Sequence, residues 1–230
     1  MILTTDPRPA AVSTPAPGDY AFGSPRYAWF VVFVLCALQF SSNMDRQVIS
    51  LVVEPLRRDF ALDDIQIGLL QGLAFALFYA LAAIPIGWAA DRWRRNRIIF
   101  WGATIWTIST VACMVAPDYP ALFVARMLVG LGEAALVPAA FSMLGDYFPR
   151  SRVSGAVSVV TGASFFGAGC ALAFGGLFLA QLPQAGMVTL PWLGAVHGWQ
   201  LAFGLVGIPG LVLLPFAAAM REATPAVQDG

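Results

Sequence analysis

The sequence predicts an all-α polytopic membrane protein with six transmembrane helices, and three observations support this. Of its 230 residues, 59% are hydrophobic and 11% are charged, whereas a typical soluble domain has about 25% charged residues. The apolar residues gather in six long segments, each close to or above the roughly 20 helical residues needed to cross a bilayer core. None of the segments shows the ten-residue polar–apolar alternation of a barrel strand, so helices are favoured over strands.

The six segments divide the chain into a bundle and two tails. The expected spans are residues 27–53, 65–90, 98–116, 121–144, 154–180 and 199–220. Residues 1–26 are rich in proline and alanine and have few large apolar residues, so we expect a disordered cytoplasmic tail before the bundle at 27–220. Residues 221–230 form a second tail. The tail at 1–26 is not a signal peptide, because no apolar core follows a basic start.

Two connections between spans differ in length. The third and fourth spans are joined by the short stretch 117–120, which forces the two helices to be antiparallel neighbours. The stretch 181–198 between the fifth and sixth spans is expected to be a long, nearly uncharged loop. It contains His197, the only histidine of the chain, which is interpreted as a bystander.

The arginines predict the orientation. Nine of them lie in the segments on one side of the spans: Arg8, Arg26, Arg92, Arg94, Arg95, Arg97, Arg150, Arg152 and Arg221. Only Arg57 and Arg58 lie on the other side, among four acidic residues. Basic loops stay in the cytoplasm, so both termini are expected there, in a multi-pass protein of the bacterial inner membrane. The formal net charge is zero, so nothing indicates a nucleic-acid partner.

Four charged residues fall inside the expected spans. Asp45 and Arg46 lie in the first span, and Arg126 and Glu133 lie in the fourth. Arg126 and Glu133 are seven residues apart and share nearly one helix face. From a rise of about 1.5 Å per residue, Arg126 lies about 9 Å, Asp45 about 16 Å and Glu133 about 20 Å below the outer end of its helix. The four side chains can therefore meet at middle depth if the two helices are neighbours.

Two interpretations of these charges remain open. Charges inside a membrane are costly, so the first interpretation is a functional site beside a polar cavity, where protons and a substrate bind. A proton on Glu133 or Asp45 would release an arginine and shift the balance between two conformations. The second interpretation is a fixed ion-pair network, since two acids and two arginines balance.

The connection after the second span carries a recognisable motif. Gly87, Asp91, Arg92 and Arg95 follow the pattern Gly-x-x-x-Asp-Arg-x-x-Arg. This pattern resembles the loop signature of the major facilitator superfamily, Gly-x-Leu-Ala-Asp-Arg-x-Gly-Arg-Lys. Arg94 stands where that family usually has glycine.

The charged spans resemble one branch of that family. Asn43-Met-Asp45-Arg46 is similar to the Asn-Tyr-x-Asp-Arg motif of Spinster-like members. The stretch from Arg126 to Ala134 is similar to their Arg-x-x-x-Gly-x-Gly-Glu-Ala motif, with Glu133 at the glutamate position. Trp199-Gln-Leu-Ala-Phe203 resembles the Trp-Arg-x-x-Phe of the sixth helix, with Gln200 in place of arginine.

The resemblance implies one half of a major-facilitator fold, since family members have twelve helices in two six-helix halves around a cavity. It implies a secondary transporter of a lysolipid-like or other amphiphilic organic solute, coupled to protons. Asp45, Arg46, Arg126 and Glu133 would form the coupling centre. Gly87, Asp91, Arg92 and Arg95 would belong to a cytoplasmic gate, in which Asp146 pairs with an arginine.

The expected partners follow from this fold: the bilayer, the solute, protons and a second six-helix half that is missing here. The chain is then a fragment, a truncated reading frame or half of a split transporter. The alternative function is a non-transporting membrane module that assembles with or regulates another half. An enzyme is not expected, because the sequence has no Gly-x-Ser-x-Gly and no His-Glu-x-x-His motif. No cofactor or metal ligand set is expected either.

Overall fold

A computed structural model describes residues 24–90, 92–181, 187–190 and 194–222. Within these residues, six helices are long and apolar enough to cross a membrane, which confirms the predicted fold class. They span Pro25–Leu51, Asp64–Ala90, Arg95–Met114, Tyr119–Tyr147, Val153–Phe178 and Gly198–Ala219. The predicted bounds agree with these to within three residues. The expected disordered tail at 1–26 falls almost wholly outside the described residues.

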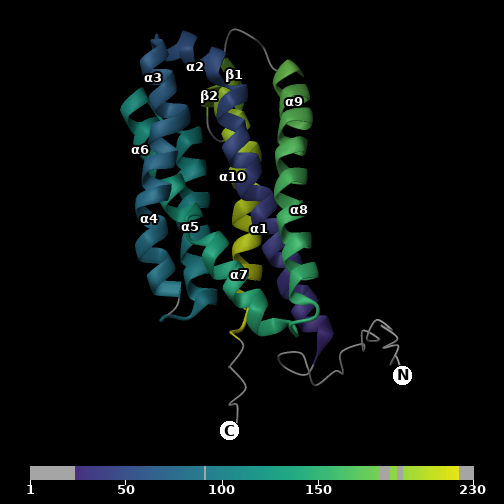
Figure 1. Cartoon of the computed structure of the whole chain (residues 1–230). Helices are drawn as coiled ribbons and strands as arrows, with labels where there is room; N and C mark the ends of the chain where they lie inside the picture. The colour runs from purple at the N-terminus through teal and green to yellow at the C-terminus, as the bar shows by residue number, and fades with distance from the viewer. Residues whose placement is uncertain (1–23, 91, 182–186, 191–193, 223–230) are drawn as a thin grey trace, which may run out of the picture.

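The helices form an upright bundle (Figure 1). The elements in chain order are α1 (Pro25–Leu51), α2 (Val53–Phe60), α3 (Asp64–Gly68), η3 (Leu69–Leu73), α4 (Ala74–Ala90), α5 (Arg95–Met114), α6 (Tyr119–Glu133), α7 (Leu136–Tyr147), α8 (Val153–Cys170), η4 (Ala171–Gly175), α9 (Gly176–Gln181), β1 (Met187–Leu190), β2 (Gly194–His197) and α10 (Gly198–Ala219). The segments η3 and η4 are single π-helical turns inside the second and fifth spans. α1 begins and α10 ends at the lower end of the bundle in Figure 1, where α4 also ends.

The packing order places the third and fourth spans at the centre. α1 packs against α8 and α10, α5 packs against α6 and α10, and α4 packs against α6. The α5–α6 contact confirms that the short connection makes these helices neighbours. In its most apolar stretch the fourth span has 61% of its residues buried, whereas the fifth has 17%. The fourth span is therefore the core of the bundle, and the fifth lies at its edge.

The fourth span is two helices rather than the single helix expected at 121–144. α6 ends at Glu133, and α7 begins at Leu136 after two residues in a turn. Pro138 has no backbone N–H, so it cannot bond to the carbonyl of Ala134 four residues earlier, and its ring crowds that carbonyl. The break therefore lies one turn before the proline and places Glu133 at a helix end.

The stretch 181–198 is not a plain loop, which corrects the expectation for it. Within its described part, β1 and β2 pair antiparallel, with Met187 opposite His197 and Leu190 opposite Gly194. The hairpin leads directly into α10, and the backbone N–H of His197 donates to Gln200 Oε1 at 2.7 Å. Gln200 therefore caps the start of α10.

The apolar core is divided into two clusters by height. The lower cluster contains Leu35 and Leu38 of α1, while the upper cluster contains Val48 and Ile49 of the same helix. Between the clusters lies a layer of eight buried polar residues: Ser41, Ser42, Asp45, Thr107, Ser109, Thr110, Arg126 and Glu133. This polar layer crosses the bundle at middle height and contains three of the four predicted site residues.

Candidate functional site

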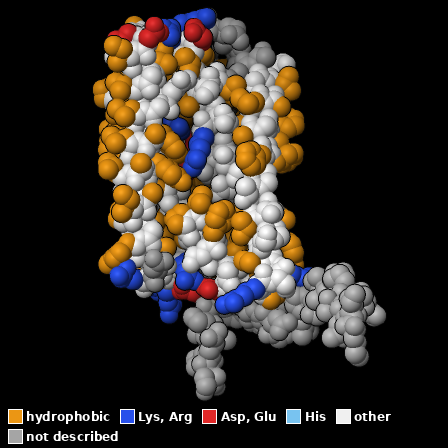
Figure 2. Space-filling model, in the orientation of Figure 1, with side chains coloured by type: hydrophobic (Ala, Val, Ile, Leu, Met, Phe, Trp, Pro, Cys, Tyr) orange, Lys and Arg blue, Asp and Glu red, His pale blue; other side chains and the backbone are white. Residues whose placement is uncertain are grey.

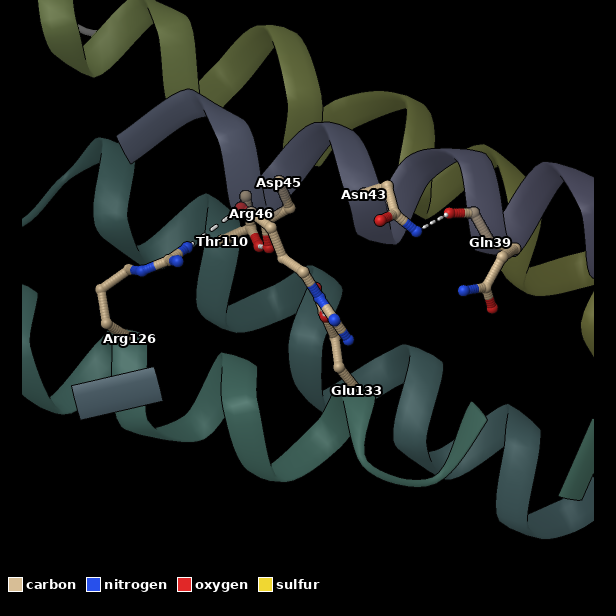
Figure 3. A network of polar contacts seen from close by, with 7 residues as sticks. All are labelled: Gln39, Asn43, Asp45, Arg46, Thr110, Arg126 and Glu133. Carbon is tan, nitrogen blue, oxygen red and sulfur yellow. Dashed lines mark hydrogen bonds and ion pairs between the residues drawn. The ribbon is translucent and has the colours of Figure 1, made fainter. Parts of the chain in front are cut away.

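The polar layer holds two ion pairs between α1 and α6 (Figure 3). Arg126 Nη1 lies 3.3 Å from Asp45 Oδ1, and both side chains are at most 2% exposed. Arg46 Nε lies 2.6 Å from Glu133 Oε2, with Arg46 32% exposed and Glu133 fully buried. Adjacent residues of α1 thus pair with residues seven apart on α6. The structure brings the four predicted site residues together.

Asp45 is held from two helices. Besides Arg126 on α6, its Oδ2 lies 2.6 Å from the hydroxyl of Thr110 on α5. That hydroxyl also lies 3.0 Å from the carbonyl oxygen of Trp106, and its single proton can be donated to only one of the two. Both carboxylate oxygens of Asp45 therefore have a donor within reach.

Glu133 is bonded on one side only. Its Oε2 accepts from Arg46, while its Oε1 is buried and has no hydrogen-bond partner among the described residues. A buried carboxylate oxygen without a donor is unfavourable, so this oxygen needs a water, a proton or the neighbouring Ser42 hydroxyl, which is also buried without a partner. The two acids of the layer therefore differ, because both oxygens of Asp45 have a donor within reach and only one oxygen of Glu133 has a partner.

Aromatic side chains of α4 lie beside both arginines. The Arg46 guanidinium is 4.9 Å from the centre of the Phe75 ring and 5.0 Å from that of Tyr79. The Arg126 guanidinium lies 5.7 Å from the centre of the same Phe75 ring. Such contacts stabilise a cation that has left bulk water. Phe75 can therefore stabilise either arginine when its carboxylate partner changes.

Gly130 explains why α4 approaches so closely. A Cβ atom at this position would lie 2.5 Å from the carbonyl oxygen of Phe75. Only glycine fits there, so the glycine of the Arg126–Glu133 motif sets the distance between α4 and α6. This contact places Phe75 over the arginines.

A groove lies next to the polar layer on the α1, α7 and α8 side. Its volume is about 420 Å³. Gln39, Asn43 and Gln47 line it from α1, at intervals of four residues that put them on one helix face. Phe141 of α7 and Phe165 of α8 line it with apolar surface. Sequence reasoning did not assign Gln39 or Gln47, although the four-residue spacing of amides within an apolar span was a visible signal.

The described residues that were expected in a cytoplasmic gate lie toward the lower end, where Figure 2 shows basic and acidic side chains together. Arg95 contacts Asp146 in an ion pair between α5 and α7, and its backbone N–H donates to Glu222 Oε1 at 3.1 Å. Gly87 lies in α4, and a Cβ atom added to it would have no neighbour within 4 Å. Asp91 lies outside the described residues. Thus Asp146 does have an arginine partner.

Two residues at the upper end share one acidic partner. Trp199, at the start of α10, is only 2% exposed, and its Nε1 donates to Asp59 Oδ2 at 2.6 Å. His197, expected as a bystander, has Nδ1 2.7 Å from the same oxygen. Asp59 of α2 thus ties α2 to the start of α10. No group of three or more metal-binding side chains lies together in the described part of the chain.

The six-helix bundle and its charged central layer define the class: a multi-pass membrane protein with the architecture of a transporter half. The sequence profile of the Major Facilitator Superfamily matches residues 35–229. The chain therefore belongs to the major facilitator superfamily of membrane transporters.

Solved structures support the Spinster-like resemblance. The chain is 32% identical to a bacterial homologue of the human lysosomal transporter Spinster, in an inward-facing and unoccupied conformation, with a TM-score of 0.80. That match covers 90% of this chain and 46% of the other. A D-xylose–proton symporter matches with a TM-score of 0.72 at 21% identity over 86% of this chain and 49% of the other, which supports the fold alone.

Curated relatives have several transport roles. The chain is 29% identical to an MFS-type efflux pump of Mycolicibacterium smegmatis over 88% of this chain and 44% of the relative. It is 28% identical to the probable galactarate/D-glucarate transporter GudP of Escherichia coli over 80% of this chain and 39% of the relative. The chain thus spans less than half the length of these relatives. Both relatives are transporters rather than enzymes.

Proposed function

We propose that the chain forms the N-terminal six-helix half of a secondary transporter that moves a lysolipid-like or other amphiphilic organic solute with protons. The observation that carries the proposal is Glu133, which is fully buried, paired with Arg46 through Oε2 and without a partner at Oε1. A residue with only a structural role would more simply be small or neutral in a membrane bundle.

Glu133 is a better candidate than Asp45 for the proton site. Both oxygens of Asp45 have a donor within reach, which stabilises its carboxylate form, whereas Oε1 of Glu133 has none. A proton on Glu133 Oε1 displaces no contact and weakens the Arg46 pair. Arg46 is 32% exposed, so it can turn away from Glu133 while keeping its aromatic contacts. Proton binding would thereby favour the conformation in which Arg46 is free.

The groove beside the polar layer supports an amphiphilic substrate. Amides line one side of it, aromatic rings line the other, and its described lining contains no basic residue. A sugar diacid, the substrate class in the name of GudP, needs cationic partners for its carboxylates. An amphiphile needs a polar wall for its head and an apolar wall for its tail, which this groove has.

A second six-helix half belongs to the proposal, because the matched relatives are more than twice as long as this chain. It would close the substrate cavity. In this arrangement Gly87, Asp91, Arg92, Arg95 and Asp146 form the cytoplasmic gate between the halves.

The proposed orientation has both ends of the bundle's chain in the cytoplasm of a bacterium. A reporter fused after Arg97 or Arg152 is then expected to report the cytoplasm, and one fused after Tyr119 the outside. An outside signal at either arginine-rich connection would overturn the orientation without affecting the fold.

The test of coupling uses the chain joined to a second half in proteoliposomes. Glu133→Gln mimics the protonated acid, so uptake of a fluorescent lysophospholipid should no longer depend on an imposed pH difference, while binding persists. Glu54→Gln, a change at a carboxylate 66% exposed at the end of the bundle, is the matched control and should retain full coupling. If Glu133→Gln and Asp45→Asn both keep gradient-driven uptake, the layer is only a structural network and the coupling proposal fails.

A further inference from the structure

A second cavity lies at the lower end of the bundle, away from the substrate groove. Its volume is about 770 Å³, and α4, α5 and the α6–α7 region line it. Three arginines form its rim: Arg92, Arg94 and Arg97. Above the rim, toward the middle of the bundle, the lining is apolar and includes Trp101 and Ile105 of α5.

Small residues create the floor of this cavity. A Cβ atom on Gly102 would lie 2.7 Å from the carbonyl oxygen of Gly132, so α5 and α6 touch through their backbones there. Gly102, Gly132 and Ala135 all face the cavity and carry little or no side chain. Trp101, 60% exposed, and Ile105, 36% exposed, lie one turn apart on the same face of α5 and form one wall of the cavity. The result is an apolar groove on the outer face of the helices, open at one end to the arginines.

Among the described residues, no carboxylate forms an ion pair with the rim arginines. Arg95, their neighbour, contacts Asp146. Arg92 instead lies over the ring of Trp88, 4.2 Å from its centre, and no ion pair joins Arg92, Arg94 or Arg97 to a described carboxylate. No acidic residue is among the described residues that line the cavity. This concentration of positive charge beside an apolar groove favours binding of an anion.

We propose that this cavity binds an anionic diacyl phospholipid, with its phosphate on Arg94 and Arg97 and an acyl chain in the groove along α5, beside Trp101 and Ile105. The lipid is favoured over a soluble phosphate because the groove continues about 12 Å along α5 from Arg97 to Ile105, by the rise of a helix. Basic pockets between membrane helices bind anionic headgroups, and an exposed tryptophan suits the headgroup level. The site shares no lining residue with the substrate groove. Arg92 of its rim also belongs to the proposed gate, so the phosphate is assigned to Arg94 and Arg97, which do not.

The test counts lipids on the full chain in detergent by native mass spectrometry, with phosphatidylglycerol and phosphatidylcholine as probes. The wild-type chain should retain phosphatidylglycerol in preference to phosphatidylcholine. Arg94→Gln/Arg97→Gln should weaken phosphatidylglycerol binding about fivefold per arginine, or about twenty-fivefold for the pair. The matched control is Arg150→Gln/Arg152→Gln, which removes two exposed arginines from another connection at the same end and should leave binding unchanged.

Two further measurements separate the lipid from other anions. Glycerophosphoglycerol, which has the headgroup and no acyl chains, should not displace the lipid at equal concentration. Ile105→Arg, which places a charge in the groove, should reduce retention while the rim stays intact. Equal loss in both arginine double variants means only general attraction to charge, and displacement by glycerophosphoglycerol means a soluble-anion site. Either result overturns the proposal.

Discussion

Two regions of this bundle pair arginine with a carboxylate, and their surroundings differ sharply. In the polar layer, Asp45 and Arg126 are at most 2% exposed and lie between two apolar clusters. At the lower end, Arg95 and Asp146 are 23% and 33% exposed and lie among other charged side chains. The same kind of ion pair is therefore expected to contribute differently to the free energy of unfolding at the two heights.

The degree of burial determines how much each ion pair contributes to stability. A charge that has left water depends on its partner, so loss of one member of a buried pair costs several kcal/mol. A pair near water exchanges its partner for solvent, and its loss costs little. The polar layer should therefore contribute to stability as well as to the proposed proton coupling. The lower pair can exchange partners at a small cost in free energy. A transporter needs a gate of the second kind, because a gate has to open in every cycle.

The largest expected effect is that of Arg126→Met. This change leaves Asp45 buried without its cation, so the free energy of unfolding should fall by about 3–5 kcal/mol. Asp45→Asn/Arg126→Met removes both charges and should recover much of that loss. Thermal unfolding in detergent, followed by circular dichroism, measures all three proteins. Arg150→Met, at an exposed arginine, is the control; an equal effect of the two single changes would mean that the layer is open to water.

Gly130→Ala tests the contact that places Phe75 over the arginines. The added Cβ would lie 2.5 Å from the Phe75 carbonyl oxygen, so α4 and α6 must separate, at about 1–3 kcal/mol. Gly145→Ala is the matched control, because nothing lies within 4 Å of its added Cβ and alanine favours a helix. The two variants should therefore shift the melting temperature in opposite directions. A stabilised Gly130→Ala protein would contradict the close approach.

The upper end gives an intermediate case. Asp59→Ala removes the acceptor of the Trp199 indole N–H, which lies near the end of the bundle where water can replace it, so about 1 kcal/mol should be lost. His197→Gln should cost less, because Trp199 keeps its acceptor. Glu54→Ala, whose carboxylate is 66% exposed, is the control and should change the melting temperature least. A larger loss in His197→Gln than in Asp59→Ala would reverse the roles assigned here.

The six spans and the central cluster could be predicted from the sequence because both rest on strong local signals. Bilayer thickness fixes the length of an apolar span. The seven-residue spacing of Arg126 and Glu133 fixes their common face. Arg46 reaches Glu133 because its side chain is long, although α1 packs mainly against α8 and α10.

Other features could not be predicted, because their signals in the sequence are weak or depend on residues far apart in the chain. Thr107, Ser109 and Thr110 complete the polar layer, but hydroxyl residues hardly change the apolar character of a span. The break at 134–135 follows from Pro138, whose presence predicts a kink and not a helix end. Burial of Trp199 depends on Asp59, 140 residues earlier, which no local pattern reveals.

The smallest expected effect on stability is that of Asp146→Asn at the lower end. It removes the carboxylate charge that pairs with Arg95, and because both side chains are partly exposed the loss should be at most about 1 kcal/mol. Raising the salt concentration to about 1 M should remove even that difference, since screening then acts within about 3 Å. In the chain joined to a second half, the same variant should slow uptake while its melting temperature hardly moves, if the pair serves the proposed gate. If Asp146→Asn lowers the melting temperature as much as Arg126→Met, the lower ion pair contributes as much to stability as the central one. The proposed difference between the two regions would then be wrong.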